Sequence, residues 1–245
     1  MRIGTSRLVA LSALAVLLGQ GVASALVVAA YGFDADLLLA DGALVERGLG
    51  TAHLLRWGGL IDMLGYLALI PVVVYMYGLH ASRGVATRVV ALCGLSFSLV
   101  GASGAVVLAS AGAWLLETPV ANPEALAAAR IAFGTLESAV VVGLWGTLEL
   151  LLLGIWFIAA GRDTQGANRL VGYAALVAGI GCLGYALRTA LAGHPPLPIA
   201  GPLDIAIIAA IGLLPVWLLW FALRLWRGEP VAAASSGARS VRSAE

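Results

Sequence analysis

Six long apolar stretches, separated by short segments that contain arginine, dominate the pattern of this chain. A helix that crosses a membrane needs about 20 apolar residues at a rise of 1.5 Å per residue. The stretches are continuously apolar, whereas the strands of a membrane β-barrel alternate over about 10 residues. The pattern therefore predicts an all-α, polytopic membrane bundle of six transmembrane helices, at residues 8–31, 54–79, 88–115, 131–160, 170–192 and 203–226.

The composition supports lipid as the main solvent of the chain. Charged residues make up 11% of the 245 residues, hydrophobic residues make up 61%, and the mean hydropathy is +1.00. Soluble domains carry about 25% charged residues. The formal net charge of +1 offers no basic surface to a nucleic acid. We expect the lipid bilayer as a partner and no nucleic acid.

Arginine predicts the orientation, because the chain contains no lysine. With the N-terminus in the cytoplasm, the arginines are concentrated in the cytoplasmic segments, as the positive-inside rule requires. The cytoplasmic arginines are then Arg2, Arg7, Arg83, Arg88, Arg162, Arg169, Arg224, Arg227, Arg239 and Arg242, and the others are Arg47, Arg56, Arg130 and Arg188. We predict a multi-pass protein of the inner (plasma) membrane with both termini in the cytoplasm.

The chain is predicted to form one six-helix domain, residues 1–228, and a cytoplasmic tail, residues 229–245. The tail contains Pro230 and mainly small or polar residues, too few apolar ones to order it. The first apolar run exceeds the 7–15 residues usual for the core of a signal peptide. We therefore expect it to stay as an uncleaved helix.

Two features suggest how the helices are arranged. Similar segments begin at Arg7, Arg88 and Arg169, each 81 residues after the last, which suggests a repeat of parallel hairpins or simply the usual arginine before an inward helix end. Small residues at helical spacing allow close helix packing or oligomer contacts. They are Gly94, Ser98 and Ala102 in the third span and Ala175 and Gly179 in the fifth. We expect these two spans at the packed centre.

Glu149 is the most anomalous residue of the pattern, because it lies near the middle of the fourth span. A carboxylate at this depth costs about 3 kcal/mol, so it should face the bundle, a partner or water. One hypothesis is an acid, base or proton-binding group. The other is an uncharged glutamic acid that bonds a neighbouring hydroxyl, such as Thr147 or Ser98, and holds helices together.

A second set of polar residues lies at similar depth near the outer ends of several helices. Asp62 and Tyr66 are one turn apart in the second span, and Tyr185 and Arg188 are three residues apart in the fifth. The full set is Asp62, Tyr66, Glu137, Tyr185, Arg188 and Asp204. They could form an outer-leaflet polar pocket for a ligand. Alternatively, each is an interfacial anchor or a simple ion pair, for instance Arg188 with Asp204 or Asp62.

The sequence contains no motif for a cofactor or a metal. HExxH, GxSxG, the phosphate-binding loop and an aspartate-rich diphosphate motif are all missing. Cys93 and Cys182 fall inside spans and lack metal-ligand spacing. We predict no cofactor and no metal site.

Several segments resemble a family of small bacterial six-helix membrane proteins catalogued as a domain of unknown function. The resemblance implies the fold and a bacterial membrane location, and it assigns no catalytic residue. It is carried by Arg56-Trp-Gly-Gly-Leu-Ile-Asp62-Met-Leu-Gly-Tyr66, Tyr77-Gly78-Leu79, Arg169-Leu-Val-Gly172, Ala178-Gly179, Tyr185 and the closing residues 220–228.

Three functions are compatible with these residues. The favoured one is a protein without enzymatic activity that binds a lipid, another amphiphile or a membrane partner through the outer polar pocket. The second is a membrane enzyme acting on an isoprenoid or lipid, such as a terpene cyclase, in which Glu149 or Asp62 protonates the substrate and Trp145 stabilises a cation. The third is a small proton-coupled transporter.

Overall fold

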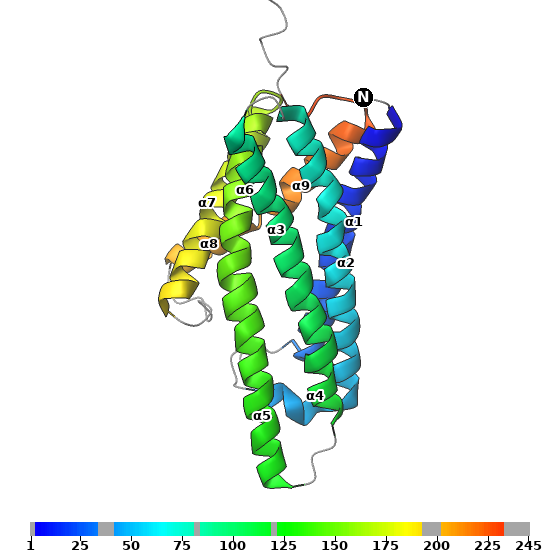
Figure 1. The fold of residues 1–245 in the computed structure, drawn as a ribbon, viewed down its shortest axis with the longest axis vertical. Helices are drawn as coiled ribbons and strands as arrows, with labels where there is room; N and C mark the ends of the chain where they lie inside the picture. Colours follow the sequence, from blue (N-terminus) through cyan, green and yellow to red (C-terminus); the bar gives the residue numbers. More distant parts are fainter. Residues whose placement is uncertain (1–2, 34–41, 81–83, 119–121, 193–201, 233–245) are drawn as a thin grey trace, which may run out of the picture.

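The computed structural model describes residues 3–33, 42–80, 84–118, 122–192 and 202–232, and these residues form a bundle of helices (Figure 1). Six of the helices are long and apolar enough to cross a membrane, so the predicted all-α fold is confirmed. The elements are α1 (Ile3–Ala30), the 3₁₀ helix η2 (Ala43–Arg47), α2 (Leu49–His80), α3 (Val85–Val107), the π-helix η4 (Leu108–Gly112), α4 (Ala113–Glu117), α5 (Pro123–Ser138), the π-helix η5 (Ala139–Glu149), α6 (Leu150–Thr164), α7 (Arg169–Ala192), α8 (Pro202–Ile211) and α9 (Leu214–Trp226).

Neighbouring spans pack as antiparallel pairs, and the last span closes the bundle. α2 contacts α1 and α3, and α6 lies between α3 and α7. α9 returns to contact both α7 and α1. The start of α1 and the end of α9 lie at the same end of the bundle, at the top of Figure 1. We call this the N-terminal end and the other the far end.

The spans differ in length, and the long ones extend the far end. The fourth span, Pro123–Thr164, has 42 residues and is therefore about 63 Å long, against about 30 Å for the hydrocarbon of a bilayer. The fifth span, Arg169–Leu191, has only 23 residues. In Figure 1, α5 and the outer ends of α2 and α4 extend well beyond α7 and α8.

The fourth span contains an unusual stretch of backbone. Its residues 139–149 form a π-helix, η5, which ends at Glu149. The Thr147 hydroxyl donates a hydrogen bond of 2.8 Å to the carbonyl of Val142, five residues earlier. π-Helical turns are rare and often occur at functional sites.

The sixth span is interrupted. α8 ends at Ile211, and α9 begins at Leu214 with Pro215 in its first turn. The proline ring fixes the start of the new helix and removes a backbone donor. α2, in contrast, continues through Pro71.

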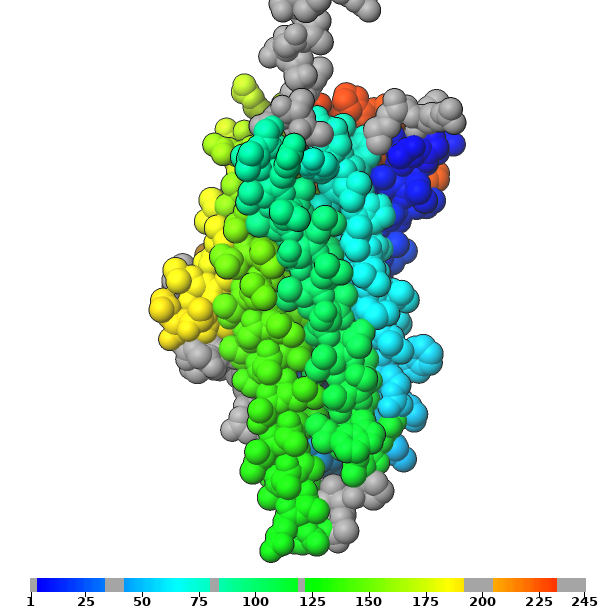
Figure 2. All heavy atoms as spheres, in the orientation of Figure 1, coloured from blue at the N-terminus to red at the C-terminus, as the bar shows by residue number. Residues whose placement is uncertain are grey.

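Small residues bring the helices close together, and those of the third and fifth spans pack against the fourth span. A Cβ atom added at Gly154 of α6 would lie 2.8 Å from the carbonyl oxygen of Gly179 on α7. Gly94 of α3 faces Trp156 of α6. The small residues of the third and fifth spans therefore both face the fourth span, which lies between them, rather than one another. Figure 2 shows α3 and α6 in continuous contact along one face of the molecule.

The folded part extends past the predicted start of the tail. Val231 is 1% exposed, and Glu229 forms an ion pair of 2.8 Å with Arg224. The guanidinium of Arg224 also donates to the carbonyl of Pro230. The rest of the predicted tail, residues 233–245, lies outside the described residues.

Candidate intramembrane carboxyl site

The centre of the site is a hydrogen bond between two buried side chains of different spans. The Tyr66 hydroxyl of α2 donates to Oε1 of Glu149, the last residue of η5, over 2.8 Å. Glu149 is 6% exposed and Tyr66 is 9% exposed. Glu149 therefore faces the bundle, as its cost in lipid predicts.

Gly101 of α3 makes room for this contact. A Cβ atom at that position would overlap the Tyr66 ring. The ring also packs edge-on against Phe97, with ring centroids 5.6 Å apart. The position of the Tyr66 hydroxyl is therefore fixed by close packing on two sides.

Asp62 is one helical turn from Tyr66 and belongs to the same site. It is buried and hydrogen-bonds the Gln20 side chain of α1. Its carboxyl is close enough to both Tyr66 and Glu149 to interact with them electrostatically. Neither of these two neighbours of Glu149, the Tyr66 hydroxyl and the Asp62 carboxyl, is basic.

Glu149 keeps one oxygen without a partner. Its Oε2 atom is buried and has no hydrogen bond within the described part of the chain. Ser98 and Thr147, the two hydroxyls considered as partners, donate to the backbone carbonyls of Gly94 and Val142 instead. A buried, unpaired polar atom costs about 1–3 kcal/mol, which makes Oε2 a candidate ligand-binding atom.

A cavity of about 620 Å³ lies beside this hydrogen bond, and we call it the Glu149 cavity. It extends between α1, α2, α6 and the interruption of the sixth span, and its walls are mainly Val, Leu, Ile and Phe side chains. The polar side chains in its wall are those of Gln20, Ser24, Tyr66 and Glu149. A large apolar cavity with a few polar groups is typical of a site for a small molecule.

The residues predicted as one outer pocket lie in different places. The structure brings Asp62, Tyr66 and Glu149 together. It places Glu137 elsewhere, where the carboxyl accepts a hydrogen bond from the Tyr31 hydroxyl at the far end. The sequence around Glu137 gave no sign of this partner, because Tyr31 comes from the end of the first span.

The predicted residues of the fifth and sixth spans are also separate from the Glu149 cavity. Arg188 lines a different cavity, between α7 and α8. Tyr185 is half-buried on α7, and the side chain of Asp204 lies outside the described residues. Trp145 donates to the carbonyl of Gly101 over 3.2 Å and is not among the residues lining the Glu149 cavity.

Sequence reasoning missed two polar residues of the first span, Gln20 and Ser24. They are four residues apart, so they lie on one face of α1. Gln20 is the only amide side chain in the six predicted spans, which was a usable signal. Neither residue carries a charge, so neither stands out in an apolar span as Asp62 and Glu149 do.

The fold and the site define a six-helix bundle of membrane-spanning length with carboxyl groups buried in its interior. Within the described residues, no three His, Cys, Asp or Glu side chains come close enough together to hold a metal ion. No protein-family model matches the chain, and no curated protein or solved structure is significantly similar to it. The functional argument therefore rests on the geometry of the site.

Proposed function

We propose that the protein binds an uncharged amphiphile, a long hydrocarbon with one hydrogen-bonding group, in the Glu149 cavity. The observation that carries this proposal is the unpaired Oε2 atom of Glu149 in a residue that lines an apolar cavity of about 620 Å³. The ligand's polar group would supply the missing hydrogen bond. Tyr66 would hold the carboxyl in place through its hydrogen bond to Oε1.

The lining favours an uncharged headgroup over an anionic one. None of the described residues in the wall is basic, and the only ionisable side chains in it are Glu149 and Tyr66. An anion in this cavity would be buried in a medium of low dielectric constant without a basic partner in the described wall, which is costly. An alcohol, ketone or quinone oxygen carries no such cost.

In this proposal Glu149 is uncharged and bonds at both oxygens. Oε1 accepts from Tyr66, as the structure has it. Oε2 carries the proton and donates it to the ligand oxygen. The hydrocarbon then lies against Phe157, Leu153 and Leu218, which line the same cavity.

A photoreactive probe tests this proposal. Geranylgeraniol carrying a diazirine at the hydrocarbon end should label residues of α1 and α9 in protein reconstituted in nanodiscs. Gly21→Leu should abolish most of the labelling, because Gly21 lines the cavity and an added Cβ atom there meets no other atom within 4 Å. The leucine side chain would therefore fill the cavity without disturbing the fold.

The matched control is Gly78→Leu, at a second glycine with open space around it. It should leave the labelling unchanged. Glu149→Leu should weaken probe binding by about tenfold, the scale of one lost hydrogen bond of about 1.4 kcal/mol. Equal labelling of the native protein and Gly21→Leu would mean that the ligand does not occupy this cavity.

A membrane enzyme is the second candidate, favoured by the aromatic rings of Tyr66, Phe97 and Phe157 in the wall beside Glu149. The carboxyl would donate its proton to one carbon of a C=C bond, leaving a carboxylate and a carbocation. Aromatic faces stabilise such a cation. Loss of a proton from a neighbouring carbon back to Glu149 would complete an isomerisation or ring closure.

This reaction can be detected in deuterated water, because the carboxyl proton exchanges with solvent. An acyclic isoprenoid alcohol incubated with the protein in D₂O should gain a carbon-bound deuterium. Glu149→Gln, which keeps the shape but cannot transfer the proton, should bind the alcohol without deuterium incorporation. Absence of deuterium from the native reaction would leave binding as the function.

We further propose that the protein resides in a bacterial inner membrane with its N-terminal end in the cytoplasm. The arginine distribution supports this orientation. Single cysteines in a cysteine-free variant test it: Glu124→Cys, at the far end, should react with an impermeant thiol reagent added to cells, and Gly166→Cys should be protected. The reverse pattern would invert the orientation.

A further inference from the structure

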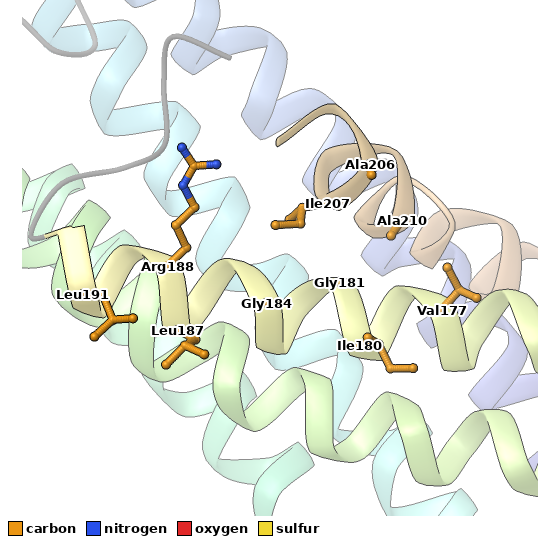
Figure 3. Close-up of a pocket in the computed structure, with 10 residues that line it drawn as sticks. All are labelled: Val177, Ile180, Gly181, Gly184, Leu187, Arg188, Leu191, Ala206, Ile207 and Ala210. Carbon is orange, nitrogen blue, oxygen red and sulfur yellow. The ribbon is translucent and has the colours of Figure 1, made fainter. Parts of the chain in front are cut away.

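A second cavity, of about 710 Å³, lies between α7 and α8 on the lipid-facing side of the bundle. We call it the α7–α8 trough. Its rim carries exposed apolar residues, among them Ile180 and Leu187, each 62% exposed. Its floor is lined by Gly181 and Gly184, opposite Ala210 and Ile207 (Figure 3). The trough is therefore open to the surrounding medium and apolar along its length.

Glycine creates the trough. An added Cβ atom at Gly181 would lie 2.7 Å from the Cβ of Ala210, so the helices touch there. At Gly184 the nearest atom of Ile207 is 3.7 Å from such a Cβ, which is ordinary contact distance. The two helices thus leave space on the Arg188 side of their contact.

A single charge lies at one end of this trough. Arg188 is the only charged residue among the ten described residues that line it. Figure 3 shows its side chain projecting from α7 on the side of the helix where Ile207 and Ala206 also lie. Arg188 already interacts with another group of the protein. A guanidinium has five N–H donors, so it can bind a second acceptor as well.

The dimensions match one leaflet of a bilayer. From Arg188 to Val177 the trough follows α7 over 11 residues, which is about 16 Å at 1.5 Å per residue. Half of the hydrocarbon core is about 15 Å thick. A chain that starts at the far end with its headgroup at Arg188 would reach the middle of the bilayer near Val177.

We infer that the α7–α8 trough binds an anionic phospholipid, with one acyl chain along Gly184 and Gly181 and the phosphate at Arg188. Charge complementarity selects the anion, because a guanidinium pairs with phosphate oxygens through two parallel hydrogen bonds. This site is distinct from the Glu149 cavity, which has one carboxyl group, that of Glu149, and no basic residue in its described wall. The two cavities would therefore select lipids of different charge.

Spin-labelled lipids test the inference in the reconstituted protein. Nitroxide-labelled phosphatidylglycerol and phosphatidylcholine, in separate samples, report the fraction of lipid immobilised by the protein. The native protein should prefer phosphatidylglycerol by about fivefold, the scale of one basic residue acting on an anionic lipid. Arg188→Gln should reduce the preference to about one, and Arg188→Lys should keep part of it.

The matched control is Arg169→Gln, at the exposed opposite end of the same helix. It should leave the preference for phosphatidylglycerol at the far end unchanged. Gly184→Leu provides a second variant that retains the charge and fills the trough, and it should release the immobilised phosphatidylglycerol. An equal preference in the native protein and Arg188→Gln, or full immobilisation in Gly184→Leu, would overturn the inference.

Discussion

The two ends of the bundle are held together by different kinds of contact. Toward the N-terminal end, Trp156, Phe157, Trp217 and Phe221 form an aromatic cluster, and each is at most 2% exposed. Their rings meet edge-on or stacked, with Trp217 and Phe221 4.9 Å apart between centroids. At the far end, a smaller apolar cluster that includes Leu44, Leu55 and Phe133 is accompanied by polar pairs between partly exposed side chains, such as Arg56 with Glu117 and Arg130 with Glu46.

The difference follows from where each end lies relative to the bilayer. The aromatic cluster is on helices that pack from several sides, and its one polar contact runs from Trp217 Nε1 to Thr164 Oγ1 over 3.0 Å. The far end is built from helices longer than a bilayer is thick, so its side chains can be charged at little cost. The Glu149 site lies between these regions, with apolar walls and one unpaired polar atom, Oε2 of Glu149.

Removing the centre of the aromatic cluster should have the largest effect on stability. Trp217→Ala leaves a cavity among the three other rings and removes the hydrogen bond to Thr164, so we expect a loss of about 3–5 kcal/mol. The measurement is reversible unfolding in mixed detergent micelles. Trp114→Ala, at a position that is 61% exposed, should change stability by less than about 0.5 kcal/mol. Similar losses in both variants would mean that the cluster is not a rigid core.

The close packing around Tyr66 should come next in size. Gly101→Ala forces the added methyl group against the Tyr66 ring, at an expected cost of about 1–3 kcal/mol. The same change at Gly78, which has open space, should be neutral or stabilising because alanine favours helix. If Gly101→Ala keeps full stability, the Tyr66 ring can move and its hydrogen bond is not fixed by packing.

Two substitutions at Glu149 distinguish a structural role of this residue from a functional one. Glu149→Leu should cost about 1–2 kcal/mol, because the buried Tyr66 hydroxyl loses its partner. Glu149→Gln keeps an acceptor and should retain most of the stability. A Gln variant that unfolds as readily as the Leu variant would show that a charged carboxylate is required, and that water or a cation reaches this part of the bundle.

The sequence predicts the fold well, because lipid places strict demands on a helix. The predicted second span, residues 54–79, lies within the observed Leu49–Leu79. At the far end the second and fourth spans begin at Leu49 and Pro123, earlier than the predicted residues 54 and 131, because apolar content alone does not show where a helix continues beyond the apolar stretch. The candidate repeat of hairpins stays a prediction.

The site was predicted only in part, because the depth of a residue along a span does not show which neighbouring helix its side chain faces. Asp62, Tyr66 and Glu149 were each identified from polarity, yet the Tyr66–Glu149 pairing depends on the π-helix that ends at Glu149. Such backbone has no clear sequence pattern. The grouping of Glu137 with Asp62 failed for the same reason, since helix rotation decides whether residues at one depth meet.

A smaller effect is expected at the polar far end from Tyr31→Phe, about 1 kcal/mol, through loss of the hydrogen bond to Glu137. Burial and then the neighbouring Glu137 carboxyl raise the pKa of Tyr31 above its ordinary value of 10.0. As the pH rises, the Tyr31 phenol therefore loses its proton in the unfolded chain before it does so in the folded protein. The stability contributed by Tyr31 falls as the pH rises above about 10. The native protein should lose stability there more steeply than Tyr31→Phe. Parallel profiles would mean that the phenol is not buried in solution.

The smallest effect should come from the Arg56 and Glu117 pair, although its geometry is good. The two N–H donors lie 2.6 and 2.7 Å from the two carboxylate oxygens, but both side chains are partly exposed, at 34% and 25%. Exposed pairs contribute little and are screened by salt. A double-mutant cycle with Arg56→Gln and Glu117→Gln should show a weak coupling that disappears in 1 M salt, where the Debye length is about 3 Å. The loss caused by Trp217→Ala should not depend on salt. A coupling that survives high salt would place this pair out of reach of water, and the far end would then be as dry as the aromatic cluster.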